Sequence, residues 1–342
     1  MKKYLLPCDG NLYKANLHCH SVLSDGRWTP EEIKENYKAN GYSVVAYTDH
    51  DIFIPHNDLT DDSFLALNGY ELAVTEKSET RISNRTCHMC FIALDKERKV
   101  QKIHYPSKYL DKNPDMVYLA EDREPITKSY TPEFISDLMR EGRDDGFFVT
   151  YNHPVWSLEA GGEYMDYHGM HAMEVINYAS VVEGYEEYNS TIYDNMLRGG
   201  KRIFCVATDD NHDYYPISHP KNDSFGGFTL IKAKELSYSA ITEALLNGDF
   251  YASEGPEIYE LYCEDGNIHI KTSDAAMISI VTDARRNQPQ TSDKKDGTIN
   301  EAVFPISEKL GAFFRIVVTD VNGKSAYTSA YFLDTVLSED EN

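Results

Sequence analysis

The sequence predicts an α/β protein: a barrel-like part of about 250 residues built from strand–helix units, followed by a small β-sandwich. In the first part, short apolar or β-branched runs alternate with amphipathic helical runs, the order typical of parallel βα units. More than five such units favour a barrel over an open sheet. Near Gly255-Pro256 the pattern changes to strand-like runs separated by turn signals, and no good helix follows.

Helix signals are clearest around residues 29–41. Thr29 is the expected N-cap, Pro30 fills the first turn, Glu32 completes a capping box and Gly41 ends the helix. The same order of residues recurs at 131–133, where Gly142 is the expected end. Further helices are expected at 183–197 and 240–246, and strands at 43–47, 89–94, 147–150, 173–176, 203–207 and 228–231.

The C-terminal strands are expected at 268–271, 278–282, 313–319 and 326–332. Asp265-Gly266, Asp296-Gly297 and Asn322-Gly323 are the turn signals between them. We therefore predict a first domain over residues 1–254, a β-sandwich-like accessory domain over 255–336 and a polar tail over 337–342. The six cysteines are expected to be thiols rather than disulfides.

Charge and hydropathy exclude several classes of protein. The 342 residues include 33 Lys and Arg against 56 Asp and Glu, a net charge of −23. This acidity argues against nucleic acid or an anionic membrane as the main partner. No apolar run reaches ~18 residues, and the N-terminal one is too short for a signal peptide, so we expect a cytoplasmic protein. Twelve histidines beside this acidity are typical of a multi-metal site.

Two histidine motifs lie at the ends of predicted strands: Asn16-Leu17-His18-Cys19-His20 ends a short strand, and Thr48-Asp49-His50-Asp51 ends the strand at 43–47. His18 and His20 share one face of an extended chain, which allows them to chelate one ion. Asp25 lies in the next turn, and His50 ends the following strand. Because the carboxyl ends of parallel strands gather active-site residues, these four side chains are expected at one edge.

These motifs resemble the opening motifs of the PHP (polymerase and histidinol phosphatase) family of metal-dependent hydrolases. The resemblance covers the first ~250 residues and implies a distorted (β/α)7 TIM-like barrel. Residues 248–256 and the β part after them are similar to the CehA/McbA-like branch, which includes a carbamate-ester hydrolase. The quoted motifs are Leu17-His18-Cys19-His20, Ser24-Asp25-Gly26, Tyr47-Thr48-Asp49-His50-Asp51, Gly69-Tyr70-Glu71, His88, Asn152-His153-Pro154 and Asp210-Asn211-His212.

The resemblance implies a trinuclear site, and nine ligands suit two or three divalent ions of zinc, manganese or iron. Asp209 rivals Asp210, but only Asp210 keeps the Asp-x-His spacing. By position, the first metal would be held by His18, His20, Glu71 and Asp210; the second by Glu71, His88 and His153; the third by Asp25, His50 and His212.

The expected function is hydrolysis of a small phosphorylated metabolite or nucleotide by a metal-bridging hydroxide. No nucleophilic side chain is required, and Asp49 is a candidate for orienting an imidazole. Alternatives are a carbamate or amide hydrolase on the same site, and a non-catalytic metal-containing binding protein. The oligomeric state stays open. Candidate substrate contacts are Arg27, Arg81, Arg85 and His219.

Overall fold

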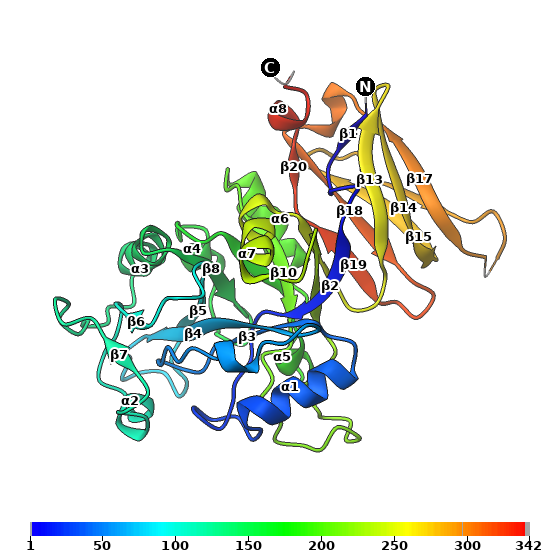
Figure 1. The fold of residues 1–342 in the computed structure, drawn as a ribbon. Coiled ribbons are helices and arrows are strands. Elements are labelled where there is room, and N and C mark those ends of the chain that lie inside the picture. Colours follow the sequence, from blue (N-terminus) through cyan, green and yellow to red (C-terminus); the bar gives the residue numbers. More distant parts are fainter. Residues whose placement is uncertain (1, 296, 339–342) are drawn as a thin grey trace.

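The computed structural model describes residues 2–295 and 297–338 and shows a mixed α/β fold with a large central sheet (Figure 1). Its order is β10-β9-β8-β5-β4-β3-β2-β11-β12-β19-β18-β15-β16. The strands of the first part are β2 (Asn11–Asn16), β3 (Val44–Tyr47), β4 (Leu65–Thr75), β5 (Thr86–Ala93), β8 (Phe147–Asn152), β9 (Ala172–Asn177), β10 (Phe204–Thr208), β11 (Phe228–Ala233) and β12 (Phe250–Ser253).

The prediction of parallel βα units holds for only part of this sheet. β2, β3 and β4 run parallel, as do β8, β9 and β10. β5 is antiparallel to both β4 and β8, and β11 is antiparallel to β2 and β12. The difference arises because residues 76–85 join β4 to β5 without a helix, so the chain turns straight back along the same sheet.

A closed (β/α)7 barrel is not confirmed. β10 is an end strand of the sheet and pairs through its backbone with β9 alone among the described strands, so the sheet stays open. β10 and β11 still lie next to each other through one side chain. The Thr229 hydroxyl accepts from the amide of Ala207 (3.2 Å) and donates to its carbonyl (3.0 Å). A bridge of this kind joins the strands without the backbone ladder that closes a barrel.

The capped helices begin where the sequence predicts, but two ends differ. Thr29 forms its capping box with Glu32 at the start of α1. α3 continues through Gly142, where a Cβ would lie only 2.2 Å from the Phe91 ring, so this glycine permits packing and does not end the helix. The helix expected at 183–197 begins only at Ser190, because Gly184 has φ +101° and caps a separate helix that ends at Glu183. The helices are α1 (Pro30–Ala39), α2 (Lys108–Lys112), α3 (Pro132–Asp144), α4 (Gly161–Tyr164), α5 (Tyr178–Glu183), α6 (Ser190–Arg198), α7 (Tyr238–Asn247) and α8 (Leu333–Val336), with 3-10 turns η1 (Asn57–Leu59) and η2 (Glu308–Leu310).

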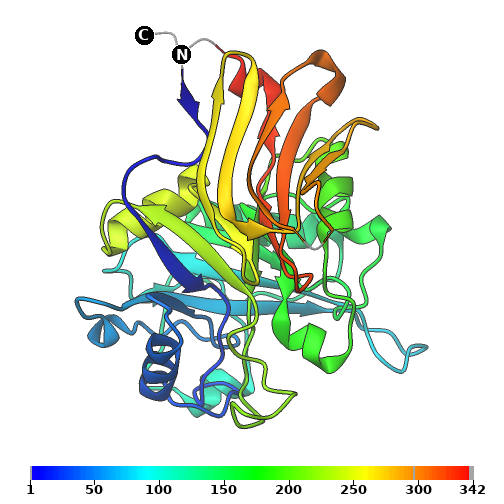
Figure 2. The same cartoon turned by 90° about the vertical axis from the view of Figure 1, so that its right-hand side faces the viewer.

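The C-terminal part is built from strands, as expected, and shares a sheet with the first part. β19 pairs with β12, so the large sheet continues into this part, while β1 pairs with β13 in a separate four-stranded sheet. Figure 2 shows its strands at the end of the molecule away from α1 and α2. Its strands are β13 (Ile258–Glu264), β14 (Asn267–Ala275), β15 (Met277–Thr282), β16 (Gln288–Thr291), β17 (Ile299–Pro305), β18 (Phe313–Thr319), β19 (Ser325–Thr328) and β20 (Tyr331–Phe332); the remaining short strands are β1 (Lys3–Tyr4), β6 (Val100–Gln101) and β7 (Tyr118–Leu119).

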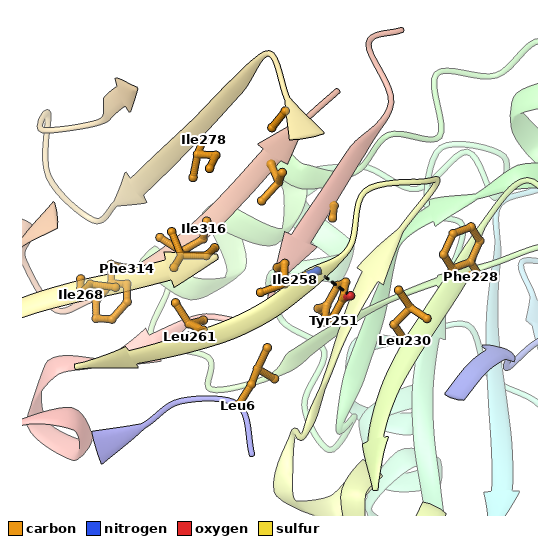
Figure 3. Packing of buried hydrophobic residues seen from close by; sticks show 14 of the residues in the cluster. Leu6, Phe228, Leu230, Tyr251, Ile258, Leu261, Ile268, Ile278, Phe314 and Ile316 are labelled. Carbon is orange, nitrogen blue, oxygen red and sulfur yellow. Dashed lines mark hydrogen bonds between the residues drawn. The ribbon is translucent and has the colours of Figure 1, made fainter. Parts of the chain in front are cut away.

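One hydrophobic cluster crosses the boundary predicted between residues 254 and 255. Phe228, Leu230 and Tyr251 of the first part pack in the same cluster as Ile258 and Phe314 of the C-terminal part (Figure 3). The Tyr251 hydroxyl accepts from the amide of Ile258 at 2.8 Å. Apolar burial of this kind is the main source of stability between packed elements.

Three further expectations concern smaller features. All six cysteines are free thiols, and five of them are buried. Within residues 2–295 and 297–338, no helix has both the length and the apolar character needed to cross a bilayer. Asp296 of the expected Asp296-Gly297 turn and residues 339–342 of the expected tail lie outside the described residues.

Candidate metal centre

The two histidine motifs lie just beyond strand ends, and the first of them is hydrogen-bonded to the loop after β10. His18 and His20 follow β2, and His50 follows β3. The amide of Asp210 donates to the carbonyl of His18 (2.9 Å), and that of His20 donates to the carbonyl of Asn211 (3.1 Å). The Nε2 atoms of His18 and His20 are 3.1 Å apart, so the i, i+2 spacing does bring the two rings together.

Glu71 is the centre of the cluster and lies inside β4, a strand absent from those expected. β4 extends to Thr75 because it pairs with β5. For the same reason β5 begins at Thr86, so His88 lies inside the strand and not before it, as the expected range 89–94 implied. Five imidazoles surround the Glu71 carboxylate. The distances from its oxygens are 2.9 Å to His50 Nδ1, 3.0 Å to His88 Nδ1, 3.2 Å to His18 Nε2, 3.3 Å to His153 Nε2 and 3.4 Å to His20 Nε2.

Asp25 draws a second set of rings together on the other side of His20. Its Oδ1 lies 3.5 Å from His212 Nε2 and 4.0 Å from His20 Nδ1, and its Oδ2 lies 3.7 Å from His50 Nε2. The nine residues expected as ligands are therefore neighbours in one cluster.

Backbone conformation helps to aim two of these side chains. His153 has φ +27° and Asp210 has φ +53°, values in the left-handed region that residues other than glycine rarely adopt. His153 directly follows β8, and Asp210 is the second residue after β10. Such strained turns persist at sites where the surrounding structure fixes them.

The donor atoms fit divalent cations. His20 with Asp25, His50 and His212, His18 with His20 and Asp210, and His50 with Glu71 and His88 each bring their ligand atoms within 4.8 Å of one another. Four buried atoms in the cluster make no hydrogen bond of acceptable geometry among the described residues. Buried polar atoms without a partner are costly unless an ion satisfies them. They are His20 Nδ1, Asp25 Oδ1, Glu71 Oε2 and Asp210 Oδ1.

Asp210 shows this geometry most clearly. Its Oδ1 lies 2.9 Å from His20 Nε2 and 3.1 Å from His18 Nε2, yet it is one of the four atoms without a hydrogen bond. Short distances with poor hydrogen-bond angles are expected where ligands converge on a common point and not on each other.

The electrostatics of the cluster also call for positive charge. Burial alone would lower the pKa of His50 and His153, but neighbouring carboxylates, Glu71 above all, raise both to about 9. Burial and the charges of His50 and His212 lower the pKa of His20 to about 4. Burial alone would raise the pKa of Glu71, but the surrounding imidazoles hold it well below its usual range. Metal binding requires charged carboxylates and neutral imidazoles, so a bound ion would displace the protons of His50 and His153, whereas His20 is already neutral.

Glu174, which was not among the predicted site residues, contacts His18 on the side of the ring opposite to Nε2 and orients it. It is fully buried in β9, and its Oε1 lies 2.7 Å from His18 Nδ1. The Thr208 hydroxyl donates to Oε1 (2.7 Å), while the amide of His153 (3.0 Å) and the Asn177 side chain (2.9 Å) donate to Oε2. A carboxylate behind a ligating imidazole fixes its orientation and tautomer. The signal was available, as a lone charged residue inside the apolar run Met173–Ile176.

Asp49 and Asp209 hold loops. Asp49 accepts from the amides and hydroxyls of Ser21 and Ser24 at 2.6–3.0 Å. These contacts stabilise the turn before Asp25, whereas the sequence suggested that Asp49 orients an imidazole. Asp209 accepts from the amides of residues 225–227 at 2.9 Å each. Of the two neighbouring aspartates, the structure therefore places Asp210 in the cluster.

The side chains of the four candidate substrate contacts pair with residues outside the cluster, although the amide of Arg27 donates to the carbonyl of His212 (2.9 Å). The Arg27 guanidinium is 4.6 Å from the centre of the Tyr214 ring. Arg81 and Arg85 pair with Glu76, and Arg85 also pairs with Glu163. His219 stacks on Tyr215. None of these four is among the described residues that line the cavity over the cluster.

That cavity has a volume of about 520 Å³. Its floor is the histidine–carboxylate cluster, and its walls come from α5 and the loop that follows β10. Lys221 is the cationic side chain among the wall residues. The described residues that line it include none from 255–336. The walls contain Trp156, Ala179, Ser180, Val182, Glu183, Tyr185, Tyr214, Tyr215, Lys221 and Asp223.

The loop between β8 and α4 carries His153 and Trp156 and is anchored by Glu159. Its carboxylate accepts from the hydroxyls of Tyr151 (2.6 Å), Tyr130 (2.9 Å) and Tyr167. Burial raises the pKa of Glu159 to about 7, although the three hydroxyls act in the opposite direction.

This raised pKa predicts a loss of stability with rising pH. Because the folded pKa of about 7 exceeds the ordinary value of 4.5, the contribution of Glu159 is complete below pH 4.5 and is lost as the pH rises through 7. The shift corresponds to about 3 kcal/mol. Between pH 5 and pH 8, wild type should therefore lose about 2.5 kcal/mol more stability than E159Q, as measured by denaturant unfolding. Glu133→Gln, at an exposed carboxylate in the first turn of α3, should show the pH dependence of wild type; equal slopes for wild type and E159Q would contradict the prediction.

Comparisons with known proteins give structural similarities at low identity. A two-domain protein from Bacteroides vulgatus containing a predicted PHP-like metal-dependent phosphoesterase is 17% identical, with a TM-score of 0.44 over 96% of this chain and 98% of that one. An amidohydrolase from Chromobacterium violaceum is 15% identical (TM-score 0.37; 58% and 87% covered). A protein from Bifidobacterium adolescentis assigned as a metal-dependent phosphoesterase is 18% identical (TM-score 0.35; 60% and 89% covered).

No family model and no curated protein matches the chain. The chemistry of the site therefore rests on its own residues.

Proposed function

We propose that this chain is a metal-dependent hydrolase of small phosphate esters. The observation that carries the proposal is the convergence of six imidazoles and three carboxylates, four of their atoms buried without a hydrogen bond, on the floor of a cavity of about 520 Å³. Structural metal sites are usually closed by four ligands, whereas this donor set exceeds four and opens to a cavity.

Two or three divalent ions are proposed, with zinc, manganese and iron all suited to mixed nitrogen and oxygen ligands. His20, Asp25, His50 and His212 would hold one ion. His18 and Asp210 would hold another beside His20, with the Glu71 carboxylate 3.2 Å from His18 Nε2. Glu71 lies close enough to His88 and His153 to share a third. When bound, such ions lower the pKa of coordinated water and neutralise charge that develops on the scissile group.

The chain's own residues would position and select the substrate. Glu174 holds His18 through its Nδ1, so that Nε2 faces the cavity floor. Trp156 lies edge-on to His88 and His153, with ring centres 5.4 and 5.1 Å away, and would exclude water on that side. Lys221 supplies a positive charge on the wall for an anionic group.

Size and charge define the proposed partner. A cavity of this volume is typical of small-molecule sites. Three bound divalent ions would bring six positive charges to a cluster that holds three carboxylates, which would attract an anion. The net charge of −23 over the whole chain still disfavours nucleic acid and anionic membranes as partners, and a cytoplasmic location remains part of the proposal.

A carbamate or amide hydrolase is the second candidate. The observation that favours it is the wall of the cavity, where Trp156, Tyr185, Tyr214 and Tyr215 outnumber Lys221. Such a wall suits a neutral substrate with a large apolar group. A non-catalytic metal-binding protein would show no hydrolysis with any divalent metal.

The test is activity before and after metal removal, on a panel of phosphate esters, carbamates and amides. We expect phosphate ester hydrolysis that falls by at least about 10³-fold after chelation and returns with zinc, manganese or iron, because the ion supplies several kcal/mol of barrier reduction. Hydrolysis confined to carbamates or amides would select the second candidate. Fewer than one bound metal per chain, in protein never exposed to chelator, would contradict both.

A further inference from the structure

A segment without regular sequence pattern, residues 95–130, covers one side of the cluster. Its contacts go to the two loops that carry Asp25 and His50. The Asn113 amide donates to the carbonyl of Leu23 (3.0 Å), and the Lys112 ammonium donates to the carbonyl of Ser24 (3.2 Å). The Gln101 amide donates to the carbonyl of Asp51 (2.9 Å). The segment is therefore fastened to the rim of the site.

Asp25 needs such support more than the other carboxylates of the cluster. Glu71 lies in β4, and its side chain is 1% exposed; Asp210 directly follows Asp209 after β10 and is 11% exposed. Asp25 lies in a turn, and its side chain is 30% exposed. Without an external contact, its carboxylate could turn towards solvent.

The contact that restrains this carboxylate comes from Tyr109 in α2. Its hydroxyl donates to Asp25 Oδ2 at 2.8 Å, and its ring stacks on that of His50, with centres 5.7 Å apart and planes 19° from parallel. Tyr109 is 9% exposed. Because Oδ2 is occupied, Oδ1 remains free, and Oδ1 is the buried atom without a hydrogen bond that faces His20 and His212.

We propose that Tyr109 is a positioning residue that fixes Asp25 and His50 together, and thereby retains the metal ion held by His20, Asp25, His50 and His212. This inference rests on the proposed function, since it assumes that the cluster binds metal. A single hydrogen bond to a ligating carboxylate restricts which oxygen it offers, and loss of such a partner typically weakens metal binding by 10–100-fold. Tyr109 therefore acts on one of the proposed ions and leaves the others unchanged.

The test is metal binding by Tyr109→Phe, which removes the hydroxyl and keeps the ring. Chelator competition with Zn²⁺, and the Co²⁺ absorption spectrum as successive equivalents are added, report on each ion without an activity assay. We expect one equivalent to bind about 10–100-fold more weakly, with its Co²⁺ spectrum changed, while the remaining equivalents are unaffected.

Two matched controls come from the same neighbourhood. Tyr105→Phe removes a hydroxyl of the same segment, which donates to Asp51 and not to a proposed ligand. Tyr214→Phe removes a hydroxyl that donates to the backbone carbonyl of Asp25. Both should bind all equivalents as the wild type does. In an Asp25→Asn background, Tyr109→Phe should have little further effect, because the carboxylate that the hydroxyl positions is already absent.

The outcomes separate the two proposals. If the wild-type chain binds no divalent metal, the proposed function fails. If the wild type binds two or three equivalents and Tyr109→Phe binds them with unchanged affinity, only the role of Tyr109 is overturned. A uniform weakening of every equivalent, shared by Tyr105→Phe, would also overturn it, because it would indicate a general effect of the covering segment.

Discussion

Replacing Glu71 by Gln is expected to lower kcat/KM by at least about 10³-fold, a barrier increase of about 4 kcal/mol. Glu71 is the carboxylate that five imidazoles of the cluster share, at 2.9–3.4 Å. Gln keeps the shape of the side chain but loses its negative charge and presents an amide donor to rings that would ligate metal. The change therefore acts on every ion that Glu71 approaches.

Metal content checks the prediction independently of any substrate. Elemental analysis of E71Q, purified without chelator, should show at least one metal ion per chain fewer than wild type. Glu76→Gln is the matched control, because Glu76 follows the same strand but pairs with Arg85 outside the cluster. Full metal content with full activity in E71Q would contradict the assignment of Glu71. A far-ultraviolet circular dichroism spectrum like that of wild type would show that the variant folds.

The histidine motifs could be predicted because their geometry is local. The i, i+2 spacing of His18 and His20 already determines that both rings face one way, and the capping box at Thr29 needs only residues three apart. Their convergence with His50 follows from a parallel strand pair, β2 and β3, which the sequence also predicted. Short-range patterns of this kind survive folding because few alternatives compete with them.

Glu174 and Tyr109 could not be placed in the same way, because each acts across a long separation in sequence. Glu174 lies 156 residues from His18, and Tyr109 lies 84 residues from Asp25. The prediction of parallel strands was wrong for β5 for a related reason. An apolar run predicts a strand but carries no information on its direction, and the helix-free connection from β4 decides it.

Gly142 and Gly184 show that one residue type can have opposite effects on a helix. Both were expected within or at the end of helical runs. Gly142 lies inside α3, where the Phe91 ring occupies the space that a Cβ would need. Gly184 ends α5, because the chain adopts a positive φ there. Sequence alone does not distinguish packing against a distant ring from a helix cap.

Breaking the buried ion pair between the two parts of the chain should cost about 3–5 kcal/mol of stability. Arg315 of β18 donates through Nε and Nη2 to the two carboxylate oxygens of Asp194 in α6, at 2.7 and 3.0 Å. The Arg315 side chain is only 3% exposed. Asp194→Ala would leave this charge buried without its partner, which is the costly way to disrupt such a pair.

Denaturant unfolding of Asp194→Ala against wild type measures the effect, and the chain supplies its own control. Arg202 and Asp334 form a second ion pair between the same two parts, but their side chains are 54% and 62% exposed. Because solvent screens such pairs, Asp334→Ala should leave the free energy of unfolding almost unchanged. Replacing both partners, as Asp194→Leu with Arg315→Met, should recover most of the loss, since no charge is then buried alone. A double variant no more stable than Asp194→Ala would show that the stability comes from the shape of this contact and not from its paired charges.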